Sequence, residues 1–196
     1  MKRTFAKLLS LFVVLTLVIA MLPAVFAVDG TVSVTAENTT LKVGDTTTVS
    51  VKDANGTAVP NVVLDSSPAG IVTISGMTIM AAKVGSATIT ATVAADEGTQ
   101  TLGSVTITVQ SAVSAITPAS SAVEIDADGE SKTFSLSVTL TGAASGDVLA
   151  VRSSDESVVT AQAGSITLPG GSCSVTLTAV KTGTAAVTLS CGTATA

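Results

Sequence analysis

The chain of 196 residues has no histidine, no tryptophan and no tyrosine, and it has only two cysteines. A serine or cysteine nucleophile needs a general base within hydrogen-bonding distance, and there is no histidine to serve as that base. The Ser-x-x-Lys and Gly-x-Ser-x-Gly spacings of other hydrolases are absent as well. Zinc sites built from histidine are excluded, and two cysteines are too few for a structural zinc site. These absences argue against catalysis, and the residues indicate no cofactor.

Aromatic residues and positive charges are also scarce once the first 27 residues are set apart. Three of the four phenylalanines lie in that segment, so Phe134 is the single aromatic residue of the remainder. The segment also holds three of the nine basic residues and none of the 14 acidic ones, which leaves six basic residues and a net charge of −8. Such a surface repels nucleic acid and anionic lipid. We therefore expect no nucleic-acid partner.

The first 27 residues have the pattern of a secretory signal peptide. Three basic residues stand within the first seven, an uncharged stretch runs from Leu8 to Leu22, and Pro23 ends it. Ala27 offers a small residue at the cleavage position. The apolar stretch is shorter than the about 20 residues that a spanning helix needs. We predict cleavage after Ala27, secretion, and no membrane insertion of the mature chain; the alternative is an uncleaved membrane anchor.

One motif occurs twice in the remainder of the chain. KVGSATITA covers residues 83–91, and KTGTAAVTL covers residues 181–189, so a shift of 98 residues superposes lysine on lysine and glycine on glycine. Each copy is a glycine turn followed by an expected strand. A repeat of nearly one hundred residues is too long for a solenoid and indicates two tandem domains. We expect them over residues 28–110 and 111–196, joined by a short link that restricts their articulation.

Apolar and polar residues alternate, with a period of two, throughout the mature chain. Residues 134–141 read Phe-Ser-Leu-Ser-Val-Thr-Leu-Thr, and the same alternation recurs along both domains. This alternation is typical of strands with one face in a core and one in water. Turn signals such as Asp53–Gly56 and Pro169–Gly171 separate the strands. Many short strands with regular turns predict an all-β fold of sandwiches.

The two domains differ after the shared motif. In the first we expect a strand over residues 86–93, a polar loop over 96–103 and a final strand over 104–109. In the second, a strand over 184–191 leaves only residues 192–196, which is too short for that loop and a last strand. We therefore expect the second domain to lack its closing strand. Three explanations stay open: a longer native protein, a strand donated by another subunit, or a six-strand variant.

The repeated motif resembles the closing signature of bacterial immunoglobulin-like domains of group 2 (BIG2). Leu41–Asp45 and, more loosely, Val123–Glu130 are similar to the early strand and glycine turn of that family, and Ser153–Val158 is similar to its serine-rich segment. Residues 53–62 are closer to the intimin and invasin type. The resemblance covers most of both domains and implies two tandem immunoglobulin-like β-sandwiches. It also implies surface-exposed modules of adhesins, surface-layer proteins and wall-associated enzymes, without catalytic residues.

Acidic residues supply the remaining candidate sites. Asp96-Glu97 and Asp155-Glu156 are the nearest approach to the paired carboxylates of glycosidases. Adjacent residues of a strand point to opposite faces, and both pairs stand in turn-like contexts, so we interpret them as solvated loop acids.

A second acidic pattern is a weak calcium candidate made of Glu124, Asp126 and Asp128. Alternating carboxylates that end at a glycine are similar to the first half of a calcium loop. The position of the final bidentate glutamate is occupied by Ser135, inside an expected strand. An ordinary turn is therefore the favoured interpretation.

The two cysteines have the parity of inward-facing strand residues. Cys173 alternates with Val175 and Leu177, and Cys191 alternates with Leu189. Both lie away from the turn that joins their strands, so they are expected at the same end of the second sandwich. A secreted protein favours a disulfide between Cys173 and Cys191. The alternative is a pair of buried thiols that behave as small apolar residues.

Phe134 has the parity of Leu136 and Val138, and we expect it to anchor the second core. Carbohydrate recognition usually needs exposed aromatic side chains. The favoured function is therefore a non-catalytic extracellular structural or adhesive module of a bacterial cell-surface protein, such as a spacer, a stalk or a surface-layer component. The alternative is an accessory module of a larger secreted enzyme that binds wall glycan or another carbohydrate. The expected partners are other cell-surface or wall components, or further domains of the same protein.

Overall fold

The computed structural model describes residues 30–95, 98–125 and 132–196, and in these ranges the chain forms strands without a helix. The all-β prediction is confirmed. No helix in the described part of the chain could span a bilayer. The predicted signal peptide, the Asp96-Glu97 pair, Asp126 and Asp128 lie outside the described residues.

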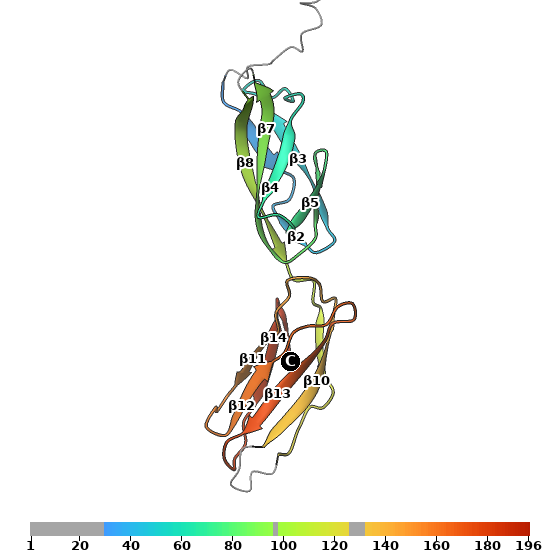
Figure 1. Cartoon of the computed structure of the whole chain (residues 1–196), viewed down its shortest axis with the longest axis vertical. Coiled ribbons are helices and arrows are strands. Elements are labelled where there is room, and N and C mark those ends of the chain that lie inside the picture. Colours follow the sequence, from blue (N-terminus) through green and yellow to red (C-terminus); the bar gives the residue numbers. More distant parts are fainter. Residues whose placement is uncertain (1–29, 96–97, 126–131) are drawn as a thin grey trace, which may run out of the picture.

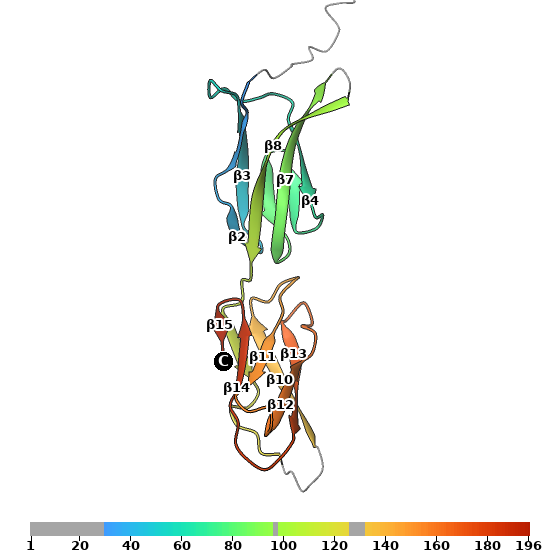
Figure 2. The ribbon, with the colours of Figure 1, turned by 90° about the vertical axis from the view of Figure 1, so that its left-hand side faces the viewer.

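The strands form two β-sandwiches that stand end to end (Figures 1 and 2). The N-terminal sandwich pairs sheet β1-β3-β6-β5 with sheet β2-β8-β7-β4, and the C-terminal sandwich pairs sheet β12-β13-β10-β9 with sheet β11-β14-β15. The strands of the N-terminal sandwich are β1 (Ser33–Ala36), β2 (Thr40–Lys42), β3 (Thr46–Lys52), β4 (Val63–Ser67), β5 (Val72–Ser75), β6 (Thr78–Ala81), β7 (Gly85–Ala95) and β8 (Gly98–Gln110). Those of the C-terminal sandwich are β9 (Ala115–Pro118), β10 (Thr133–Thr141), β11 (Ala150–Ser153), β12 (Val159–Ala163), β13 (Ser172–Ala179), β14 (Val187–Cys191) and β15 (Ala194–Thr195).

Each sandwich has its own hydrophobic core, built by the period-two alternation of its strands. Along β3 and β13 buried residues alternate with more exposed ones: Val49 and Val51 of β3 and Val175 and Leu177 of β13 face the opposite sheet, and Thr47 is buried with them. The buried residues of the first core run from Leu41 to Val109, and those of the second run from Val113 to Cys191. Burial of these apolar side chains is the main force that holds the sheets together.

The repeated motif occupies equivalent places in the two sandwiches. Residues 83–91 contain the turn before β7 and its first half, and residues 181–189 lead into β14. The strand before each motif, β6 or β13, lies in the other sheet, so each motif crosses from one sheet to the other. The last strand of the N-terminal sandwich, β8, then returns beside the motif in antiparallel register, whereas β15 pairs with Ser190 and Cys191, directly after the second motif.

Three of the predictions about strands are wrong. The polar loop expected over residues 96–103 is largely strand, because β8 begins at Gly98 and pairs with β7 from Ala95↔Gly98 onward, with a register shift at Ala91/Thr92. The strand expected over residues 184–191 begins only at Val187. A strand does follow Cys191: the two-residue β15, which the sequence did not predict because a two-residue turn replaces the longer loop.

Candidate functional site

The junction between the sandwiches is the first candidate site. β8 ends at Gln110, and the chain passes through Ser111 and Ala112 directly into the C-terminal sandwich. A second connection lies beside this link: the backbone N–H of Val84, in the turn before β7, donates a hydrogen bond of 2.9 Å to the carbonyl of Ser145. Two attachments at separate points resist bending more than a single covalent link does. The expected short link is therefore reinforced by a contact that the sequence analysis did not predict.

The loop that carries Ser145 is fixed by Asp147. The Oδ2 atom of Asp147 accepts a hydrogen bond of 2.8 Å from the N–H of Ala144, and the N–H of Asp147 donates one of 3.2 Å to the carbonyl of Ala144. These two bonds close a tight turn that presents Ser145 to Val84. The other carboxylate oxygen of Asp147 is buried and has no hydrogen-bond partner among the described residues.

Gly146 allows the two sandwiches to approach at this turn. A Cβ atom at this position would lie 2.8 Å from the carbonyl oxygen of Val84 and 2.9 Å from Cγ of Lys83. Its φ angle of +89° also belongs to the region that favours glycine. Any larger residue would therefore push the loop away from the N-terminal sandwich.

Ser111 packs the covalent link against the C-terminal sandwich. Its Oγ accepts a hydrogen bond of 3.1 Å from the N–H of Val113 and lies 3.9 Å from Sγ of Cys191. A Cβ atom on Gly192, in the turn between β14 and β15, would lie 2.7 Å from Cβ of Ser111. The link is thus held by close packing as well as by hydrogen bonds.

The two cysteines are both buried and both free in the structure. The Cys173 thiol, in sheet β12-β13-β10-β9, donates a hydrogen bond of 3.1 Å to the carbonyl of Gly164, whereas the Cys191 thiol lies beside Ser111 in the opposite sheet. The two thiols are thus separate in this structure, each with its own neighbours, and the disulfide between Cys173 and Cys191 stays a prediction. Burial raises the pKa of Cys191, and the negative charge of Asp147 adds to this effect.

Only some of the acidic candidates, Glu124 and the Asp155-Glu156 pair, belong to the described residues. Of the weak calcium candidate only Glu124 belongs to the described residues, and its side chain is exposed. No group of three potential metal ligands occurs within the part of the chain that the structure describes. Asp155 accepts hydrogen bonds from both the N–H and the hydroxyl of Ser157, at 2.9 Å and 2.6 Å. These bonds lower the pKa of Asp155 and mark it as a turn-forming residue.

Phe134 is 40% exposed, so the expectation that it anchors the core is wrong. It has the inward parity, since it pairs with buried Leu177, but burial along β10 begins only at Leu136. Because β10 ends at the junction, Phe134 lies at the far end of the sandwich (Figure 1). The opposite sheet is short there, since β15 pairs only with the junction end of β14. The opposite sheet therefore covers the phenyl ring of Phe134 only in part.

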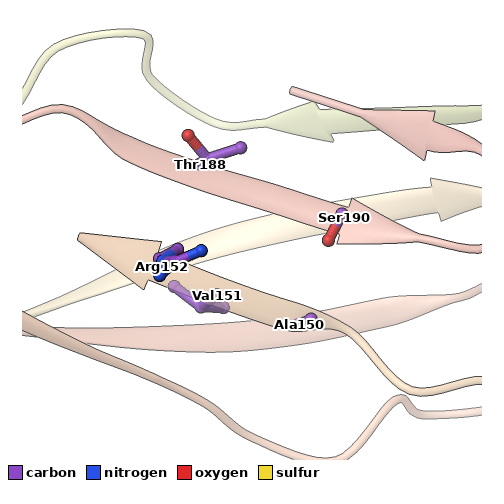
Figure 3. A pocket seen from close by; sticks show the side chains of 5 residues that line it. All are labelled: Ala150, Val151, Arg152, Thr188 and Ser190. Carbon is purple, nitrogen blue, oxygen red and sulfur yellow. The ribbon is translucent and has the colours of Figure 1, made fainter. Parts of the chain in front are cut away.

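A hollow of about 550 Å³ lies on the sheet of β11 and β14. Figure 3 shows the side chains that line it: Ala150, Val151, Arg152, Thr188 and Ser190. Arg152 and Thr188 face each other across the two strands, and no aromatic, acidic or nucleophile–base pair is among the lining residues. The equivalent position of the N-terminal sandwich, opposite Thr90, carries Asp65 instead of arginine. This open hollow has the residues of an ordinary solvated sheet surface.

No protein-family model matches the chain, and no curated protein matches it. Among solved structures it is similar to the adhesin InvE of Yersinia pseudotuberculosis, with 17% identity, a TM-score of 0.54, and coverage of 82% of this chain and 54% of that one. The S-layer protein SbsC matches with 18% identity and a TM-score of 0.38 over 84% of this chain and 26% of that one. The bacterial integrin-binding protein invasin matches with 19% identity and a TM-score of 0.30 over 83% of this chain and 37% of that one.

The chain therefore spans between about a quarter and about half of the length of these proteins. The likeness to InvE shows a bacterial immunoglobulin-like fold.

Proposed function

We propose that the chain is a non-catalytic structural or adhesive module of a bacterial cell-surface protein, acting as a spacer, stalk or surface-layer component. In this proposal residues 1–27 are a signal peptide, and residues 28–110 and 111–196 are two immunoglobulin-like domains of the group 2 type with some invasin-like features. Its partners are other surface or wall components, or further domains of the same protein.

The observation that carries this proposal is the reinforced junction. A spacer must hold its domains at a defined separation, and the hydrogen bond from Val84 to Ser145 adds a second attachment beside the link at Ser111. The likeness in fold to InvE, an adhesin, agrees with this role. The net charge of −8 over residues 28–196 and the absence of histidine disfavour nucleic-acid binding and nucleophilic catalysis.

The first experiment tests by small-angle X-ray scattering whether the two sandwiches of the mature chain are held in a rigid, extended arrangement. We expect an extended, narrow distribution of shapes for the wild type. G146V should broaden it, because the new side chain displaces the loop from Val84. G44V is the matched control: Gly44 also has a positive φ angle, of +96°, but a Cβ atom there meets nothing within 4 Å. A flexible wild type, or equal broadening in both variants, would remove the main support of the spacer proposal.

The second experiment tests location and adhesion. Antibody labelling of intact cells of the source bacterium should detect the chain at the surface, and its N-terminus should be Val28. Beads coated with the chain should bind other surface components of those cells. An intracellular, uncleaved chain would contradict the proposal.

The exposure of Phe134 favours one alternative, an accessory module that binds wall glycan or another carbohydrate. An exposed phenyl ring can stack on the apolar face of a sugar. Binding on a glycan array that is lost in F134A, but kept in the exposed-surface control T139A, would support this alternative over the spacer.

A further inference from the structure

The turn of residues 144–147, which we call the junction turn, carries the second attachment between the two sandwiches. The carbonyl of Ser145 accepts the hydrogen bond of 2.9 Å from the N–H of Val84. The nearby N–H of Ala82 instead donates a hydrogen bond of 2.9 Å to the carbonyl of Ile71, inside the N-terminal sandwich. The N–H of Val84 therefore reports whether the junction turn is attached, whereas that of Ala82 reports on the N-terminal sandwich alone.

Another turn of the chain has the same construction. In the turn after β2, the N–H of Lys42 donates to Oδ2 of Asp45 at 3.0 Å, and the N–H of Asp45 donates to the carbonyl of Lys42, also at 3.0 Å. The third residue of both turns is a glycine with a positive φ angle, of +96° at Gly44 and +89° at Gly146. Asp45 is exposed, whereas Asp147 is half-buried. A turn of this kind therefore does not require burial of its aspartate.

The burial of Asp147 leaves one of its oxygens in an unfavourable place. Its Oδ2 atom accepts the bond from Ala144, but its Oδ1 atom is buried and has no hydrogen-bond partner among the described residues. Burial and also the charge of Asp147 raise the pKa of the Cys191 thiol, so the two side chains are neighbours, yet no hydrogen bond joins them. A buried acceptor without a partner loses its bonds to water and gains none in return.

We propose that the junction turn is a releasable latch between the two sandwiches, and that Asp147 sets how easily it opens. In the open state the turn moves away from Val84 and Cys191, and both carboxylate oxygens of Asp147 are hydrated. Space for this movement lies beside the turn, where a hollow of about 420 Å³ separates residues 147–149 from residues 163–166. The covalent link at Ser111 then acts as a hinge. This inference concerns the junction itself and does not depend on a location at the cell surface.

Hydrogen exchange at the amide of Val84 measures the opening, because a bonded amide exchanges with water when its surroundings open locally. The informative variant is D147N, which keeps an oxygen for the N–H of Ala144 and places an NH₂ donor toward the sulfur of Cys191, a weak acceptor. We expect Val84 to exchange at least about threefold more slowly in D147N than in the wild type, because the buried position is no longer unpaired. D147A removes the bond to Ala144 and should speed the exchange of Val84 at least about tenfold.

Two controls separate the latch from general stability. The amide of Ala82 should exchange at the same rate in every variant, because its bond lies within the N-terminal sandwich. D45N makes the same substitution in the turn of the same construction, where the aspartate is exposed, and should leave the exchange of Val84 unchanged. If D147A fails to fold, as judged by circular dichroism, the comparison of D147N with the wild type still decides the question.

Several outcomes would overturn the proposal. These are equal exchange of Val84 in the wild type and D147N, faster exchange in D147N, no acceleration in a folded D147A, and an equal change in D45N. A wild-type Val84 that exchanges as fast as an unbonded amide would also overturn it, because the junction turn would then not be attached. A rigid, extended shape in the scattering experiment without a response to D147N would remove the latch and leave the spacer proposal in place.

Discussion

The two sandwiches contain the same motif at equivalent places, but the motif forms different lengths of strand. In the N-terminal sandwich β7 begins at Gly85 and runs for 11 residues, whereas in the C-terminal sandwich β14 begins at Val187 and runs for five. Gly183 corresponds to Gly85, so the second strand begins four residues later in the motif. The sequences differ little there. What differs is the neighbour: β8 is 13 residues long, and β15 is two.

This difference shows that strand length in the motif is set by pairing rather than by local propensity. An isolated strand gains no ladder hydrogen bonds, and ordering its backbone costs about 1–2 kcal/mol per residue. Residues 184–186 remain outside the strand although they have the composition of one. The burial of Ile89 and the partial exposure of Val187 follow from the same cause.

The largest expected effect is a difference in stability loss between substitutions at Ile89 and at Val187. I89A should destabilise the N-terminal sandwich by about 2–5 kcal/mol, because it leaves a cavity in a filled core. V187A should cost only about 1 kcal/mol, since the valine is half-buried. Calorimetry should show one transition shifted strongly in I89A and the other shifted weakly in V187A. T88A, on the exposed face of β7, should change neither by more than about 0.5 kcal/mol. Equal losses at both positions would contradict the comparison.

A second comparison lies within the C-terminal sandwich, between its buried middle and its far end. L140A should cost about 2–5 kcal/mol, because Leu140 is 1% exposed in the core. F134A should cost no more than about 2 kcal/mol, since much of the ring is already in water. Urea titration of both variants gives the two free energies of unfolding. A greater loss for F134A than for L140A would show that Phe134 is a core residue after all.

These contrasts also show which features the sequence could predict. The alternation of Leu136, Val138 and Leu140 gave the buried face correctly, because that pattern depends only on neighbouring residues. The same parity failed for Phe134, because burial also needs an opposite sheet, and no local pattern reports how far that sheet extends. The contact of Val84 with Ser145 was missed for the same reason, since it joins loops 61 residues apart in sequence. The one local sign was Ser145-Gly146-Asp147, a turn-forming run whose partner the sequence does not reveal.

The cysteines provide a smaller test of the C-terminal sandwich. Both thiols are buried and free in the structure, so the intact mass of the native protein should be the same with and without reductant. Alkylation at pH 8 should be slow at Cys191, because burial raises its pKa and the thiolate is the reactive form. Unfolding in urea should make both thiols react rapidly. A native mass two hydrogens lower, restored by reductant, would instead establish the disulfide between Cys173 and Cys191.

The smallest expected effect is a dependence of the stability of the C-terminal sandwich on pH in the acid range. The hydrogen bonds from Ser157 hold the pKa of Asp155 below its ordinary value. A group whose pKa is lower in the folded state stabilises the fold above its unfolded pKa of about 3.9, and this contribution is lost as the pH falls through the folded value. S157A removes the hydroxyl bond, so its melting temperature should fall slightly at pH 6 and converge with that of the wild type in strong acid. The transition of the N-terminal sandwich should stay in place in both proteins, and a constant difference at every pH would show that Ser157 acts through packing rather than through the charge of Asp155.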